Sequence, residues 1–267
     1  GIIGLGKDAN PTEVTRMTDA LAHRGPDGSG LWMQGRVGLG HRRLSIIDLS
    51  KSSAQPMVTK EGIHAVTFNG EIYNFQSERA QLESRGHTFV STGDTEVLLR
   101  LFTEKGVACL EHLRGMFAFA AVDMQKKEAI LVRDRMGKKP LYYFINKQRI
   151  AFASEIKALR TLPDCPKEID TEALRHFMLI GYLPAPFTGI QGIQKLPAAH
   201  VLRINWETGA INLEQYWKLP EGPALDVSEK ELTSMIDASI SEAVKLRMIS
   251  DVPLGAFLSG GVDSSAV

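Results

Sequence analysis

The sequence has little cysteine, no imbalance of charge and no long apolar run. Only two of its 267 residues are cysteines, Cys109 and Cys165, and they form no CxxC pair or other metal-binding spacing. Both lie in apolar or proline-flanked surroundings, so we expect free thiols in a reducing compartment such as the cytoplasm. Lysine plus arginine equals aspartate plus glutamate at 31 each, so no basic field favours nucleic acid or an anionic membrane surface.

Signals for membrane insertion and secretion are also missing. No stretch reaches the roughly 18 apolar residues that a membrane-spanning helix needs, and no charged segment followed by an apolar one opens the chain. Hydrophobic residues nevertheless make up 43% of the sequence and charged residues 23%, which is the balance of a globular protein with a real core. We therefore expect neither a nucleic-acid nor a membrane partner.

Short strands separated by turns, with a few helices between them, dominate the first two thirds of the chain. Helices are predicted from Pro11 after an Asn10 cap, over 75–85, over 95–104 and over 171–180. In the last of these, Leu174, Phe177 and Met178 are expected to point inward. Apolar runs between turn signals predict strands over 30–34, 37–41, 63–68, 116–122, 129–133, 141–145 and 150–153, and a closing hairpin over 201–204 and 211–215.

The pattern changes after residue 227. A capping-box sequence at Ser228 and Glu231 is followed by one apolar helical stripe: Leu232, Ile236, Ile240, Val244 and Met248. A short apolar run over 254–258, expected to be a strand, then leads into a glycine-rich loop. Helix, strand, glycine loop and helix start are typical of a parallel α/β nucleotide-binding domain. We therefore divide the chain into a first domain over 1–216, a linker over 217–227 and the start of a second domain over 228–267.

The loop over residues 259–265 (SGGVDSS) has a composition suited to phosphate. Glycines let the backbone approach an anion closely, and backbone N–H groups, serine hydroxyls and a helix start supply donors. The lysine of a Walker A loop is absent, and the simpler alternative is a Gly-Ser turn after a strand.

The same string resembles the SGGxDSS pyrophosphate loop of ATP pyrophosphatases, enzymes that adenylate a carboxylate or carbonyl. The resemblance implies that the loop holds the β- and γ-phosphates of ATP through Ser259, Gly260, Gly261, Ser264 and Ser265. It also implies that Asp263 helps to place Mg²⁺ and that the Leu258 backbone contacts the nucleotide.

Several earlier strings follow one another in a fixed order. They are residues 23–27 (HRGPD), 41–48 (HRRLSIID), 68–74 (FNGEIYN), 92–96 (TGDTE), 115–119 (GMFAF), 133–135 (RDR) with 139–143 (KPLYY), and 153–159 (ASEIKAL). Together with SGGxDSS, they are similar to the class II glutamine amidotransferase domain of glutamine-hydrolysing asparagine synthetases, from Gly1 to Val267. The resemblance implies an α+β fold: an N-terminal-nucleophile-type α/β/β/α sandwich up to about Tyr216, followed by the first helix and strand of a parallel α/β adenine-nucleotide-binding domain.

Within these strings, Asn69 and Gly70 suit an oxyanion hole. Glutamine hydrolysis in this family passes through a thioester, whose tetrahedral intermediates need donors for a negative oxygen. Asn69 supplies a side-chain amide and Gly70 a backbone N–H without a Cβ in the way. In isolation, an Asn-Gly pair also reads as a hairpin turn. Arg24 and Asp27 are expected to shape a loop over the site.

Free glutamine also has to be held by its α-carboxylate and α-ammonium groups. Arg43 offers a bidentate fork for the carboxylate, with the Ile46 backbone beside it. Glu71 and Asp94 are anionic partners for the ammonium group. A surface salt bridge is the plainer alternative for Arg43, and a cap of the helix from Thr95 is the plainer alternative for Asp94.

The nucleophile implied by the resemblance is an N-terminal cysteine whose own α-amine acts as general base. Residues 1–4 (GIIG) match the tail of the CGIxGI-like string that this cysteine opens, either directly or, as the distance to His23 suits better, after a gap of a few residues. In both registers we expect the nucleophile to precede this sequence. Cys109 is expected to be a buried small hydrophobe. The chain as written should therefore bind glutamine weakly and hydrolyse none.

The resemblance implies an ATP- and Mg²⁺-dependent ligase that uses ammonia from glutamine to amidate aspartate through an acyl-adenylate. One alternative is a related amidotransferase of the same architecture that amidates another carboxylate, for instance on a surface-polysaccharide sugar. Another is a non-catalytic binding domain without the cysteine, against which the complete glutamine set argues. A phosphoribosyl or sugar-phosphate amidotransferase would lack the SGGxDSS loop. The residues that select the acceptor are expected beyond Val267, and a homodimer is one expectation for the assembly.

Overall fold

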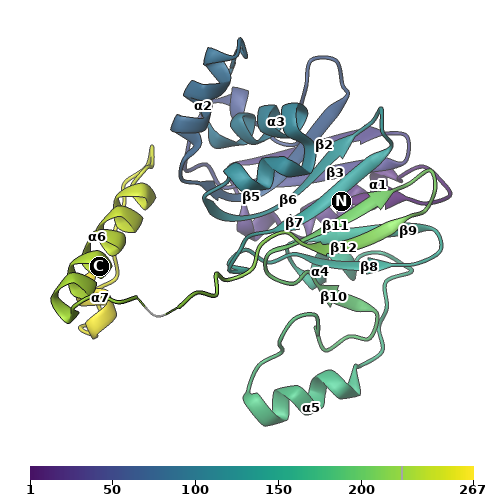
Figure 1. Cartoon of the computed structure of the whole chain (residues 1–267). Helices are drawn as coiled ribbons and strands as arrows, with labels where there is room; N and C mark the ends of the chain where they lie inside the picture. Colours follow the sequence, from purple (N-terminus) through teal and green to yellow (C-terminus); the bar gives the residue numbers. More distant parts are fainter. Residues whose placement is uncertain (224) are drawn as a thin grey trace.

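Two antiparallel sheets of six strands each form the centre of the molecule, which is a computed structural model describing residues 1–223 and 225–267 (Figure 1). The first sheet contains, in spatial order, β10 (Ile193–Lys195), β8 (Tyr142–Ile145), β9 (Arg149–Ala153), β1 (Ile2–Gly4), β3 (Val37–Arg43) and β2 (Gly28–Gln34). The second contains β12 (Ile211–Gln215), β11 (His200–Asn205), β7 (Glu128–Arg133), β6 (Gly115–Asp123), β5 (His64–Ile72) and β4 (Met57–Val58).

Helices cover the outer face of each sheet. The first sheet carries α1 (Pro11–Asp19) and α4 (Ile156–Leu159), and the second carries α2 (Phe75–Ser84) and α3 (Asp94–Lys105). Short 3₁₀ helices occupy Ala22–Arg24, Lys51–Ser53 and Gly106–His112. The helix α1 begins as predicted, because the Asn10 side chain accepts a hydrogen bond from Thr12 N and proline occupies the first turn.

Strand β6 shows how the layers are built. Phe117 and Phe119 belong to a cluster with α2 and α3, whereas Ala118 and Ala120 belong to the cluster between the two sheets. Successive side chains of a strand point to opposite faces, so one strand serves both interfaces. A third cluster joins α1 to the first sheet. The layer order is therefore α/β/β/α, and the predicted sandwich is confirmed.

The helix α5 (Thr171–Ile180) forms where the sequence predicts it, but its apolar face is not buried. Leu174 is 51% exposed, Phe177 48% and Met178 77%, so the prediction that they point inward is wrong. Figure 1 shows α5 projecting away from both sheets. A periodic apolar stripe identifies a helix with one apolar face, but the stripe does not identify what covers that face.

The end of the chain contains α6 (Glu229–Arg247) and α7 (Val262–Ala266), which lie apart from the sheets in Figure 1. The capping box of Ser228 with Glu231 is present as predicted. The strand predicted over 254–258 is absent among the described elements, since a parallel strand needs neighbours to pair with. The predicted linker includes residue 224, which lies outside the described residues. Within residues 1–223 and 225–267, no helix has the length and apolarity needed to cross a membrane.

Candidate active site

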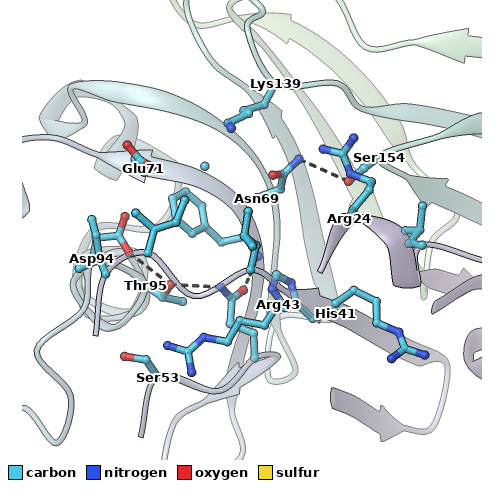
Figure 2. A pocket seen from close by; sticks show the side chains of 18 residues that line it. Arg24, His41, Arg43, Ser53, Asn69, Glu71, Asp94, Thr95, Lys139 and Ser154 are labelled. Atoms are coloured by element: carbon cyan, nitrogen blue, oxygen red, sulfur yellow. Dashed lines mark hydrogen bonds between the residues drawn. The ribbon is translucent and has the colours of Figure 1, made fainter. Parts of the chain in front are cut away.

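A cavity of about 210 Å³ opens where β3, β5, the start of α3 and the end of β9 come together. All six residues predicted for the glutamine site border it: Arg43, Ile46, Asn69, Gly70, Glu71 and Asp94. Figure 2 shows Glu71, Asp94 and Thr95 on one side of this pocket, Arg24 and Ser154 on the other, and Asn69 between them. Residues as far apart in the sequence as Arg24 and Ser154 therefore meet in one place.

Asn69 and Gly70 lie inside β5, where they pair with Ala118 and Phe117 of β6. The alternative of a hairpin turn is therefore wrong. A Cβ atom on Gly70 would lie 2.1 Å from Met116 O, so only glycine lets the two strands approach this closely. The amide nitrogen of Asn69 donates a long hydrogen bond of 3.5 Å to Ser154 Oγ across the pocket. The two groups are adjacent donors on a rigid strand.

The guanidinium group of Arg43 is held by the loop that follows β3. Its Nη1 donates to Ser50 O at 2.7 Å, and its Nη2 donates to Asp48 O. Arg43 takes part in none of the ion pairs found among the described residues, so the alternative of a surface salt bridge is wrong. Because a guanidinium carries further N–H donors, Arg43 can still donate hydrogen bonds to a carboxylate at the pocket wall.

Asp94 is the first residue of α3, and Gly93 occupies the cap position. The prediction that Asp94 caps this helix is therefore wrong by one residue. The Asp94 side chain instead accepts a hydrogen bond from Ile72 N at 3.0 Å. Burial raises the pKa of Asp94 to about 6, with the Ile72 hydrogen bond opposing the rise and the Glu71 charge adding to it. At neutral pH two negative charges therefore face the cavity.

Two residues of the 41–48 string, to which the sequence assigned no role, organise this side of the site. Burial and then the Arg43 charge lower the pKa of His41 to about 4, so this pocket residue is neutral. Asp48 is buried and accepts hydrogen bonds from Ser50 N at 3.0 Å and Thr92 N at 2.7 Å. Burial alone would raise the pKa of Asp48. A hydrogen bond from the Ser50 hydroxyl, together with these two backbone bonds, outweighs burial and holds that pKa well below its usual range. Asp48 thereby ties the Arg43 loop to the loop before α3.

Gln55 is a pocket residue that the sequence gave no reason to select. Its Oε1 accepts from Phe68 N at 2.7 Å, and its Nε2 donates to Thr95 Oγ1 at 3.2 Å. It joins the oxyanion strand to the start of α3, yet it lies outside every recognisable string. Lys139 and Ser154 also border the cavity and do lie within such strings.

Arg24 and Asp27 lie where the 3₁₀ helix Ala22–Arg24 leads into β2. Arg24 borders the cavity, and its Nη1 lies 3.1 Å from Glu155 Oε1. Asp27 accepts a hydrogen bond from Ser45 N at 2.8 Å and so supports the chain after β3. Arg24 therefore borders the cavity, whereas Asp27 does not, and their shaping of a loop over the site stays a prediction.

A second, smaller cavity is bordered by Gly1 together with Asn69 and Ser154. The Gly1 amine donates to Phe152 O at 2.7 Å, which fixes the residue before β1 at this second cavity. Cys109 is fully buried, and burial raises the pKa of its thiol to about 12, so it is inert as predicted.

The glycine loop borders neither of these two cavities. Gly260 has φ of 78°, α7 starts at Val262, and the hydroxyls of Ser259 and Ser264 lie 2.9 Å apart. Asp263 is exposed, and the described residues contain no group of three His, Cys, Asp or Glu side chains that could hold a metal by themselves. A cation here would need oxygen ligands from a bound phosphate as well.

Comparison with known proteins gives two family matches. The family described as "Glutamine amidotransferase domain" matches residues 1–217, and the family described as "Asparagine synthase" matches residues 235–267. Relatives include glutamine-hydrolysing asparagine synthetase 3 of Bacillus subtilis, 38% identical over 95% of this chain and 41% of the relative. Amidase chry2 of Gibberella zeae is 37% identical over 96% of this chain and 38% of its own length. The chain spans less than half the length of these relatives.

A solved structure similar in fold is a glutamine phosphoribosylpyrophosphate amidotransferase from B. subtilis in complex with ADP and GMP. It has a TM-score of 0.58 and 20% identity, and it covers 81% of this chain and 48% of its own. At this identity the likeness shows the fold alone, which is the amidotransferase sandwich. Since the family match covers residues 1–217, the chain belongs to the glutamine amidotransferase domain family, and its residues 235–267 match part of the asparagine synthase family.

Proposed function

We propose that residues 1–216 bind glutamine and that the whole protein uses its amide nitrogen to convert aspartate into asparagine. The observation that carries the proposal is the convergence of Arg43, Asn69, Gly70, Glu71 and Asp94 on one cavity. Arg43 takes the α-carboxylate, with the Ile46 backbone beside it, and Glu71 and Asp94 take the α-ammonium group. The polarity of the pocket thus matches that of a free amino acid, which needs a cation at one end and anions at the other.

The side-chain amide of glutamine then lies beside Asn69 and Gly70. Attack by a thiolate produces a negatively charged oxygen, and the Asn69 amide and the Gly70 N–H stabilise it as fixed donors. The thiol belongs to a cysteine that precedes Gly1, which borders a cavity shared with Asn69. Its α-amine takes the thiol proton and returns it to the leaving ammonia.

ATP is the proposed second substrate, supported by the asparagine synthase match over 235–267. Leu258, Ser259, Gly260, Gly261, Ser264 and Ser265 supply backbone and hydroxyl donors of the kind that polyphosphates need. Asp263 fits Mg²⁺ only in combination with phosphate oxygens, since the described residues contain no group of three His, Cys, Asp or Glu side chains that could hold a metal. A free carboxylate is a poor electrophile, so the aspartate β-carboxylate would attack the α-phosphorus of ATP, release pyrophosphate and become an acyl-adenylate. Ammonia would then attack its carbonyl carbon and displace AMP.

The acceptor carboxylate has a second candidate. Amidase chry2, whose name does not mention asparagine, is similar to this chain over 96% of its residues, about as much as the asparagine synthetase relatives are. A related enzyme that amidates another carboxylate would use the same glutamine pocket. The domain division into 1–216, 217–227 and 228–267, a cytoplasmic location suited to two free buried thiols, and a homodimer stay predictions.

The test supplies the cysteine that the resemblance implies. It uses the direct register, because Gly1 already borders a cavity shared with Asn69 and Ser154 and a longer gap would move the cysteine away from them. We expect the chain extended by Met-Cys directly before Gly1, with the methionine removed, to release glutamate from glutamine, whereas the same extension with Ser in place of Cys releases none. The full-length protein should form asparagine, AMP and pyrophosphate from glutamine, aspartate and ATP. Glutamate release without asparagine would leave the glutaminase function standing and favour another acceptor, and no release from the cysteine-bearing chain would contradict the proposal.

A further inference from the structure

Asp251 lies outside the glutamine cavity but contacts the loop that builds it. Its backbone N–H donates to Ile46 O at 2.9 Å, and its carboxylate Oδ2 accepts from Asp48 N at 2.7 Å. The two hydrogen bonds run in opposite directions to residues two positions apart. Asp251 therefore binds one short stretch of loop at two points, and two contacts restrain the position of that loop more strongly than one.

The Asp48 N–H has a particular need for this partner. Asp48 is 5% exposed and has φ of 52°, a conformation that non-glycine residues rarely adopt. A buried backbone N–H without an acceptor is unfavourable, so the carboxylate of Asp251 stabilises the unusual turn at Asp48. The remaining bonds of Asp48, to Ser50 and Thr92, depend on the same turn.

The turn at Asp48 in turn positions Arg43. The Arg43 guanidinium donates to Asp48 O and to Ser50 O, and Ile46 itself borders the cavity. A displacement of residues 46–50 would therefore move the group that receives the glutamine α-carboxylate. Asp251 does not touch the cavity, so any effect it has on glutamine passes through this loop.

The segment around Asp251 is itself anchored. The guanidinium carbon of Arg247 lies 4.6 Å from the centre of the Tyr73 ring, and Ile249 packs against the core cluster below α2 and α3. These contacts place Asp251 at the loop through packing that is independent of its own hydrogen bonds. Asp251 belongs to the asparagine synthase match and leads to the glycine loop at Ser259, whereas Ile46 and Asp48 belong to the amidotransferase match.

We propose that Asp251 is a positioning residue for the glutamine site, so that glutamine affinity depends on the asparagine synthase region of the chain. The inference rests on the proposed function, because it concerns the same pocket. Loss of the Asp251 carboxylate frees the Asp48 N–H, loosens the turn and spreads the orientations of Arg43. The expected effect is roughly a five- to tenfold weaker affinity for glutamine. It is smaller than the roughly 10- to 150-fold loss of a direct hydrogen bond to a charged group, because it reaches glutamine only through the loop.

The experiment titrates L-glutamine into the nitrogen-labelled chain, with amide signals and amide exchange followed by NMR. Asp251→Ala should weaken binding five- to tenfold and speed exchange of the Asp48 amide, and Asp251→Asn, which keeps an acceptor oxygen, should restore much of both. The matched control is Glu242→Gln, which breaks the exposed pair with Arg114 at 2.9 Å without touching the loop, and it should behave like the parent.

Each contrary result has one meaning. If the parent binds glutamine and Asp251→Ala binds it equally well, the positioning role is wrong and the proposed function stands. If Glu242→Gln weakens binding as much as Asp251→Ala, general docking of α6 is responsible and the specific role of Asp251 is wrong. If the parent shows no glutamine-dependent shifts at residues 43–46, 69–71 and 94, the proposed function fails and this inference fails with it.

Discussion

At the scale of single residues, Asp94 carries a charge that burial opposes. Its pKa of about 6 lies above the ordinary aspartate value of 3.8, so between those values the folded chain binds more protons than the unfolded chain. Its contribution to the free energy of unfolding therefore falls as pH rises through 6, and it is unfavourable at pH 7. The native fold keeps this carboxylate although it lowers stability, which is what a binding role requires.

We expect Asp94→Asn to separate stability from binding. The amide oxygen can still accept from Ile72 N, and removal of the buried charge should raise the free energy of unfolding at pH 7 by on the order of 1–3 kcal/mol, an advantage that shrinks as pH falls through 6. Glutamine binding should be lost at every pH. For the unchanged chain, glutamine affinity should fall below pH 6 as Asp94 takes up a proton. Thermal melts and glutamine titrations from pH 5 to 8 measure both effects, and a less stable variant at pH 7 would contradict the argument.

Asn69 and Arg43 should affect different kinetic constants in the cysteine-bearing chain. Asn69→Ala removes a donor that acts on the negative oxygen of the intermediate, so kcat should fall roughly 100- to 1000-fold with little change in KM. Arg43→Lys loses the bidentate fork in the ground state, so KM should rise at least about tenfold with a smaller change in kcat. Steady-state glutamate release distinguishes them. A large rise in KM for Asn69→Ala would place the amide at the substrate rather than at the intermediate.

Site residues could be predicted from the sequence only where the residue type itself indicates the chemical role. Asn69, Gly70 and Arg43 could be predicted because a donor pair and a guanidinium stand in recognisable strings. Gln55 could not, since its role arises from a position between β5 and α3 that exists only after folding. The raised pKa of Asp94 likewise depends on burial, which the sequence does not specify.

At the scale of helices and strands, α6 is a helix stabilised mainly by local interactions. Its capping box at Ser228 is complete, and none of its residues is fully buried. A helix with little tertiary packing depends strongly on its caps. Ser228→Ala should therefore cost about 1 kcal/mol of local helix stability and speed amide exchange over its first turns. The melting temperature of the main thermal transition, which reports unfolding of the sandwich, should stay within about 1 °C of that of the unchanged chain. A large drop in that transition would mean that α6 is coupled to the sheets.

Substitutions on the exposed apolar face of α5 are expected to leave the stability of the chain nearly unchanged. Met178 is 77% and Leu179 82% exposed, so replacing both with Gln removes little buried apolar area. The melting temperature of this chain should change by less than about 2 °C, as is usual for surface substitutions. As a contrast within the same helix, Ala173 is completely buried, and Ala173→Gln should destabilise the chain. Equal losses from both changes would show that the α5 face is covered in solution.

Helices and strands could be predicted where the local sequence determines them. They could not be predicted where their structure or burial depends on a neighbouring segment. The alternation along β6 predicts a strand with two buried faces, and caps predict the starts of α1 and α6. The strand expected over 254–258 has the right apolar residues, but a parallel strand acquires its structure from neighbours. Similarly, the stripe on α5 predicted its helix but not its surroundings.

At the scale of the whole molecule, the α/β/β/α order requires its outer helices to be fixed to the sheets. Arg149 on β9 is 4% exposed, pairs with Glu13 of α1, and has its Nε 3.1 Å from Asp164 Oδ2. This ionic group lies under α1, beside the third core cluster. It links a helix near residue 13 to a strand near residue 149, so it stabilises a contact between distant parts of the chain.

Breaking this buried group on one side should destabilise the whole sandwich. Glu13→Ala leaves the Arg149 charge buried without its main partner, which typically costs about 3–5 kcal/mol, so we expect the melting temperature to fall by roughly 10 °C or more. The control Glu172→Ala, which breaks an exposed pair with Arg175 on α5, should change it by about 1 °C at most. The double variant Glu13→Leu with Arg149→Met should recover much of the loss, because the charge is then removed along with its partner. If the single variant were as stable as the control, the pair would add nothing to the attachment of α1, and apolar packing of Val14 and Met17 would hold the outer layer alone.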